Sequence, residues 1–88
     1  MFEKQVTLVN EVGLHARPAS VFIQSSVRFI SDISVIKDDV AYNAKSIMSV
    51  LSMGASKGDT ITIRAEGEDE QLAVERLVDL CANHLEDY

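Results

Sequence analysis

The sequence predicts an α+β domain built as an open-faced β-sandwich, in which a four-stranded, mainly antiparallel sheet carries three helices on one face. Three observations predict it. The 88 residues fit a single domain, which we place at residues 1–88. Segments of alternating apolar residues and segments of helical spacing follow one another in the order β-α-β-β-α-β-α. Each strand pattern has one apolar face, so helices are needed on only one side of the sheet.

The first strand is expected at residues 3–9, where Val6 and Leu8 fall on one face. The first helix is expected from Ala16 to about Arg28, because apolar residues recur there at helical spacing. These apolar positions are Ala19, Phe22, Ile23 and Ile30.

An antiparallel hairpin is expected next, with strands at 32–36 and 40–42 joined by a turn at 37–39 that contains two aspartates. A short helix over 47–53 follows. Ser46 is expected to cap its first turn and Gly54 to end it in the left-handed conformation.

Residues 60–65 alternate as the fourth strand, and a long last helix follows Gly67. The acidic run 68–70 suits the positive end of this helix. Its apolar stripe is formed by Val74, Leu77, Val78, Cys81 and Leu85.

Composition argues against several classes of protein. The net charge is −6 and the eight basic residues are scattered, so we expect no direct nucleic-acid partner. No apolar run approaches the roughly 18 residues of a membrane span, and the first ten residues lack the pattern of a signal peptide. The single cysteine excludes an internal disulfide. We therefore expect a cytoplasmic protein that is not inserted in a membrane.

The stretch GLHARPAS, residues 13–20, places reactive groups at the start of a helix. Pro18 has no N–H to donate and belongs in a first helical turn, so the helix should begin near residues 15–17. The backbone N–H groups of Ala16 and Arg17 then have no acceptor within the helix. Together with the positive end of the helix dipole, they form a site for an anion such as phosphate.

His15 would be the nucleophile of this site. The positive helix end favours the neutral imidazole, whose lone pair can attack phosphorus. Arg17 can neutralise the attached anion, and Gly13 lets the chain turn sharply before it. The three groups suit transient phosphoryl transfer through histidine. The ordinary alternative is a surface histidine followed by a solvated arginine.

GLHARPAS, the downstream NAKSIMSVL and the element order together resemble HPr, the histidine-containing phosphocarrier family of the bacterial sugar phosphotransferase system. The resemblance covers essentially the whole chain. It implies that enzyme I, with phosphoenolpyruvate as the original donor, phosphorylates His15 on Nδ1. The phosphoryl group would then pass to enzyme IIA domains of sugar permeases. Arg17 matches the arginine that stabilises the phosphoryl group.

Ser46 matches the regulatory serine of the Gram-positive branch. The resemblance implies its phosphorylation by HPr kinase/phosphorylase and binding of the product to catabolite control protein A. An ordinary helix cap is the common alternative for such a serine, and both roles are compatible.

The resemblance also implies that Ile47 and Met48 form an exposed apolar patch for docking enzyme I and enzyme IIA. We include Leu51 in this patch, and Ser20 and Gln24 would extend it. From the residues alone, core packing is favoured for most of the apolar members.

Two positions depart from the family pattern. Val12 stands where many Gram-positive members carry a small polar residue, which changes how His15 is held. Ser49 replaces a common glycine, which strengthens the helix by at least about a few tenths of a kcal/mol and adds bulk where the kinase docks.

Three other functions compete with the phosphocarrier interpretation: a metal site, a phosphatase and a regulatory binding module. Cys81 and His84 have the spacing of two metal ligands but no second pair, so we expect no metal and no cofactor. A phosphatase would need a further acid or base beside His15. A purely regulatory binding module, in catabolite repression or nitrogen regulation, would share the fold. In a regulatory paralogue glutamine replaces the histidine, so His15 favours the carrier. We expect a monomeric carrier that is not an enzyme by itself.

Overall fold

The computed structural model describes residues 1–85, and the last three residues of the expected domain lie outside that range. The element order confirms the prediction. The strands are β1 (Phe2–Thr7), β2 (Asp32–Lys37), β3 (Val40–Asn43) and β4 (Thr60–Glu66). The helices are α1 (Ala16–Ser26), α2 (Ile47–Met53) and α3 (Glu70–Asp79), with α3 continuing into a π-helical turn, η1 (Leu80–His84).

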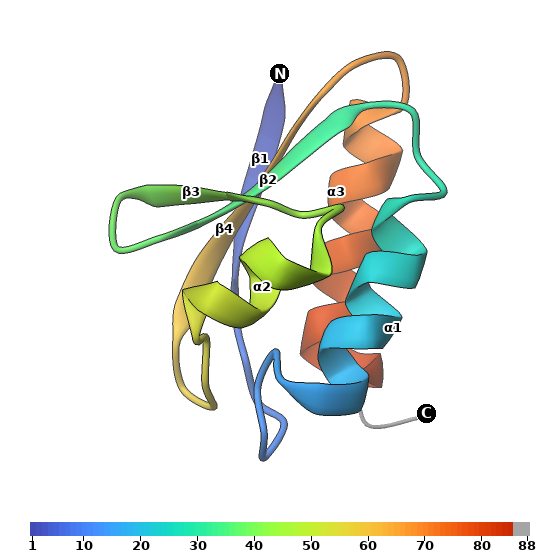
Figure 1. Cartoon of the computed structure of the whole chain (residues 1–88). Helices are drawn as coiled ribbons and strands as arrows, with labels where there is room; N and C mark the ends of the chain where they lie inside the picture. Colours follow the sequence, from blue (N-terminus) through green and yellow to red (C-terminus); the bar gives the residue numbers. More distant parts are fainter. Residues whose placement is uncertain (86–88) are drawn as a thin grey trace.

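The strands form one sheet in the order β1-β4-β2-β3, and every pairing is antiparallel. The helices lie together on one side of it (Figure 1). In β4, Ile61, Ile63 and Ala65 are buried and alternate with more exposed residues, as the sequence pattern predicts. The architecture is therefore the expected open-faced sandwich.

The core lies between this sheet face and the helices. Phe22 of α1 and Leu77 of α3 are fully buried against it, and Cys81 joins them from η1. Burial raises the pKa of the Cys81 thiol to about 12. The sequence prediction of Cys81 as a small core residue is confirmed.

Three strands, β2, β3 and β4, extend one residue beyond expectation, and two elements, β1 and α1, end earlier. The strand at 3–9 ends at Thr7, because Leu8 then bonds a loop: its N–H donates to Asp59 at 2.9 Å and its carbonyl accepts from Gly58 at 2.8 Å. The helix expected to reach Arg28 ends at Ser26. Ile30, assigned to the apolar stripe of that helix, is 70% exposed, so that assignment is wrong.

Asp69 accounts for the early turn after α1. Its carboxylate accepts hydrogen bonds from the N–H groups of Ile30 at 2.9 Å and Ser31 at 3.0 Å, and from the Ser31 hydroxyl at 2.5 Å. These bonds hold residues 30–31 in a turn and leave the Ile30 side chain outside. The Ser31 hydroxyl, followed by the backbone donors, holds the pKa of Asp69 below its usual value.

Candidate functional site

The loop between β1 and α1 leads to His15 and is held by close backbone contacts. Gly13 has φ +61°, and a Cβ on it would lie 2.4 Å from the Ala55 carbonyl oxygen and 2.6 Å from the Ser56 Cα. Gly13 is therefore required both for its backbone conformation and for close contact with the segment after α2. The N–H of the fully buried Leu14 donates to the same Ala55 oxygen at 3.0 Å.

His15 is the N-cap of α1. Its backbone is extended, with φ −126° and ψ 162°, and its carbonyl accepts the first helical hydrogen bond from Ala19 at 3.4 Å. Pro18 is buried as the third helical residue. The predicted helix start is confirmed, and the first-turn N–H groups of Ala16 and Arg17 have no acceptor within the helix.

Ala16 has an unusual backbone conformation. Its φ is +52°, in the left-handed region that a residue with a Cβ rarely adopts, at a cost of roughly 1–2 kcal/mol. Such strain collects at functional sites, where surrounding contacts enforce it. Here the strained residue directly follows the candidate nucleophile.

The side chains of this site are available to a ligand. His15 is half-buried and Arg17 is exposed. Within residues 1–85, neither side chain takes part in a hydrogen bond or ion pair. An imidazole, a guanidinium and free backbone donors at the positive end of α1 can accept and hold a phosphoryl group.

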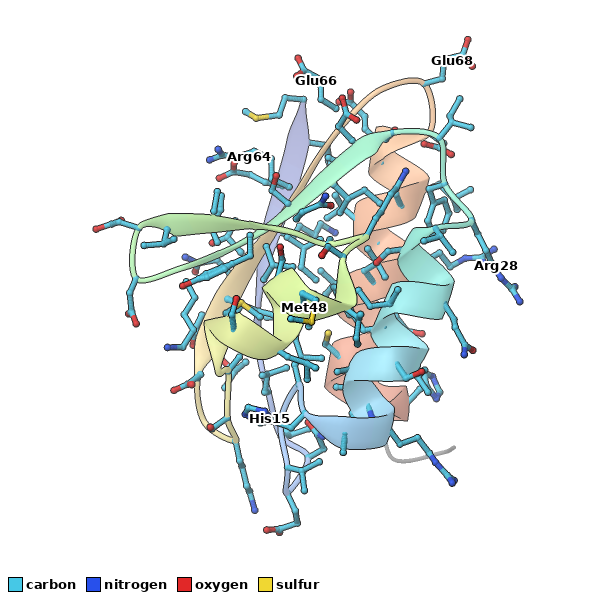
Figure 2. All side chains as sticks on the ribbon, viewed as in Figure 1. His15, Arg28, Met48, Arg64, Glu66 and Glu68 are labelled. Carbon is cyan, nitrogen blue, oxygen red and sulfur yellow. The ribbon has the colours of Figure 1, made fainter. Side chains whose placement is uncertain are left out.

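The apolar side chains of α2 divide between core and surface. Val50 and Met53 are buried, whereas Ile47, Met48 and Leu51 are 39%, 75% and 40% exposed. Core packing, favoured from the residues alone, is therefore wrong for these last three. Met48 and His15 lie on the same side of the molecule (Figure 2).

The rest of the expected docking surface is also accessible. Ser20 and Gln24 are exposed on α1, and α1 packs against α2. Val12, directly before Gly13, is 49% exposed and adds an apolar side chain to the His15 loop.

Ser46 is the N-cap of α2, as predicted. Its side-chain oxygen accepts a hydrogen bond from the Ser49 N–H at 3.3 Å, and the residue is half-buried. Gly54 ends the helix with φ +67°, which confirms the predicted left-handed cap. Ser49 contributes through its backbone, so the departure from glycine leaves the cap intact.

The rival metal site does not form in the described part of the chain. Cys81 is buried in the core, while His84 is exposed with Nε2 at 3.3 Å from an Asp79 carboxylate oxygen. No group of three or more His, Cys, Asp or Glu side chains within residues 1–85 could hold a metal ion. None of the helices in this range is long and apolar enough to cross a membrane.

Sequence reasoning missed one residue of the His15 loop. The sequence gives no role to Asn10, yet its side chain is buried and donates a hydrogen bond to the Gly13 carbonyl at 2.8 Å. The spacing of an asparagine three residues before a glycine is the available signal, because asparagine side chains often bond nearby backbone in turns.

The fold and the site define a class: small open-faced sandwiches that present a histidine at a helix N-terminus. A family model described as the PTS HPr component phosphorylation site matches residues 2–83, and the chain belongs to this HPr family. Members of this family include phosphocarrier proteins.

The relatives that are similar to the chain include both HPr-like Crh proteins and HPr phosphocarrier proteins. It is 49% identical to the HPr-like protein Crh of Halalkalibacterium halodurans, over 89% of this chain and 93% of the relative. It is 43% identical to the phosphocarrier protein HPr of Buchnera aphidicola, over 88% and 91%. The crystal structure of HPr-C-His from Thermoanaerobacter tengcongensis superposes with a TM-score of 0.90 at 47% identity, covering 92% of this chain and 91% of that one.

Some relatives are dimers. A Crh structure from Bacillus subtilis, described as a swapped dimer, covers 99% of this chain at 40% identity with a TM-score of 0.72. The expectation of a monomer thus finds no support among these relatives.

Proposed function

We propose that this protein is the phosphocarrier of a phosphoenolpyruvate-dependent sugar phosphotransferase system. His15 accepts a phosphoryl group from phospho-enzyme I and passes it to enzyme IIA domains of sugar permeases. The observation that carries the proposal is the position of His15 as N-cap of α1, with Arg17 and unpaired first-turn N–H groups beside it.

The chemistry follows from that position. A ring nitrogen lone pair of His15 attacks phosphorus, and the bond between phosphorus and the donor breaks in line with the new P–N bond. The family resemblance assigns the attack to Nδ1. The Ala16 and Arg17 N–H groups and the Arg17 guanidinium meet the charge on the phosphoryl oxygens. Transfer to enzyme IIA reverses these steps, with the P–N bond breaking.

The test is incubation with enzyme I and phosphoenolpyruvate, followed by intact mass before and after mild acid. We expect a gain of one phosphoryl group that acid removes and that His15→Ala abolishes. Arg17→Ala should slow the gain without abolishing it. An unchanged mass of the wild-type protein would refute the carrier role.

A second, regulatory function has its own support. Crh relatives are as much as 49% identical to this chain, and Ser46 places a half-buried hydroxyl at the N-cap of α2. We propose that HPr kinase/phosphorylase phosphorylates Ser46 and that the product binds catabolite control protein A. A phosphate there adds about −1.5 to −2 charge, which the helix N-terminus tolerates and an acidic partner would repel.

ATP and the kinase should add a phosphate that survives mild acid and is lost in Ser46→Ala. Ser52→Ala is the matched control, because Ser52 lies in the same helix but is not its N-cap, and its hydroxyl donates to the Ser49 carbonyl at 2.9 Å. If Ser46 stays unmodified, the regulatory role fails and the carrier role is unaffected.

The proposed partners also imply a docking surface on this protein and a cellular compartment for it. Ile47, Met48 and Leu51 would dock enzyme I and enzyme IIA, with Ser20 and Gln24 at the border of the patch. Flexible, exposed Met48 suits a surface that accepts several partners in turn. Transfer to permease domains and regulation by a kinase would place the protein in the cytoplasm.

A further inference from the structure

The orientation of the His15 ring depends on the backbone that leads to it. In the part of the chain that the structure describes, no side chain hydrogen-bonds the ring, and His15 makes no side-chain cap. An in-line transfer needs the attacking nitrogen held toward phosphorus, and a displacement of about 1 Å can cost roughly 100-fold in rate. The backbone of residues 10–14 therefore sets the position and direction from which the His15 ring projects.

Asn10 closes this loop from two sides. Its side-chain Nδ2 donates to the Gly13 carbonyl at 2.8 Å, and its own carbonyl accepts from the Gly13 N–H at 3.2 Å. Both polar groups of the Gly13 backbone are thus held by one residue. Asn10 is only 4% exposed, so solvent cannot easily replace these bonds.

The buried side chain of Asn10 also carries an energetic cost. Its Oδ1 is buried, and within residues 1–85 it has no hydrogen-bond partner. A buried acceptor without a partner is unfavourable, and an aliphatic side chain of similar size would avoid that cost. What the polar side chain adds over an aliphatic one is its hydrogen bond to the Gly13 carbonyl.

The neighbouring residue cannot supply the same bond. Val12 is exposed and has no polar side-chain atom. From Gly13 the path continues through the Leu14 N–H, bonded to the Ala55 carbonyl at 3.0 Å, directly to His15. We propose that Asn10 is a positioning residue for phosphoryl transfer, which sets the direction of His15 by holding Gly13; this rests on the proposed carrier function.

The test compares Asn10→Leu with Ser26→Ala. Leucine fills similar volume and removes the orphan acceptor, but it leaves the Gly13 carbonyl without its donor, so we expect the variant to fold with reduced stability. Ser26 is the control because it is also buried and donates to a backbone carbonyl, that of Phe22 at 2.9 Å, but at the far end of α1. Two readouts are needed: the NMR chemical shifts of the His15 ring, and initial rates of phosphorylation against phospho-enzyme I concentration.

We expect Asn10→Leu to move the NMR chemical shifts of the His15 ring and to lower the maximal rate by about 10- to 100-fold, with KM unchanged because α2 is untouched. Ser26→Ala should leave both readouts as in the wild type. The same ring shifts and maximal rate in the two variants would overturn the proposal. If the wild type accepts no phosphoryl group, the carrier function fails, and the ring shifts still decide whether Asn10 orients His15.

Discussion

Replacing Gly13 with alanine tests how tightly the site is built onto the rest of the molecule. Two separate penalties are expected. A Cβ at φ +61° costs roughly 1–2 kcal/mol, and the backbone atoms of Ala55 and Ser56 lie where that Cβ must go. Because backbone cannot move aside as a flexible side chain can, overpacking adds roughly 1–3 kcal/mol. We expect Gly13→Ala to lower the free energy of unfolding by about 2–5 kcal/mol.

Gly54→Ala is the matched control. Gly54 has nearly the same φ, +67°, but no atom lies within 4 Å of the Cβ position. It should cost only the backbone penalty, roughly 1–2 kcal/mol. Urea unfolding of both variants measures the difference, which reports the contact between the His15 loop and residues 55–56.

The same pair separates stability from function. Gly13→Ala should slow phosphorylation of His15 at a temperature where the variant is fully folded, because the clash displaces the chain two residues before the nucleophile. Gly54→Ala should not. Equal destabilisation by the two substitutions would show that the close packing of Gly13 is not a constraint, and the reasoning would fail.

Three further outcomes are expected. In steady-state assays, Met48→Ala should raise KM for enzyme I with little change in maximal rate. Leu72→Ala is the control, because Leu72 is an apolar side chain on α3 that is 48% exposed, and it should change neither quantity. The lowered pKa of Asp69 means that its contribution to stability is present above the unfolded pKa near 3.8 and is lost as pH falls through the lower folded pKa. Asp69→Asn should therefore flatten the acid limb of stability against pH, as measured by urea unfolding. The Cys81 thiol, with its pKa raised to about 12, should resist alkylation near pH 8 in the native protein and react once denaturant exposes it.

The features predictable from sequence are those that depend on local backbone chemistry. Pro18 restricts where a helix can begin, Ser46 can cap a first turn, and Gly54 can adopt a left-handed cap. Each of these effects acts within about one helical turn, so a short stretch contains all the information. The helix start at His15 and both ends of α2 agree with the structure for that reason.

The features that escaped prediction depend on residues distant in sequence. The carboxylate of Asp69 turns the chain at Ile30 and Ser31, across 39 and 38 positions. The apolar spacing near α1 gives no sign of Asp69. The sequence therefore predicts too long a helix and places Ile30 on its apolar stripe. The resemblance to HPr implied the exposure of Met48, but the residues alone did not, because α2 has only seven residues and its pattern does not show which face the sheet covers.

Residues 54–56 connect helix α2 to the loop that leads to His15. Gly54 ends α2, the Ala55 carbonyl accepts the Leu14 N–H at 3.0 Å, and Gly13 packs against the backbone of Ala55 and Ser56. The helix that bears the exposed apolar patch is thereby connected to the loop that bears His15 by backbone contacts, which are stiffer than side-chain contacts. For the proposed transfer, a partner that docks on α2 would meet His15 at a fixed position, and the same surface could present the phosphoryl group to donor and acceptor in turn. Binding energy from α2 would thus be used to align the nucleophile, which is the main requirement of an in-line phosphoryl transfer.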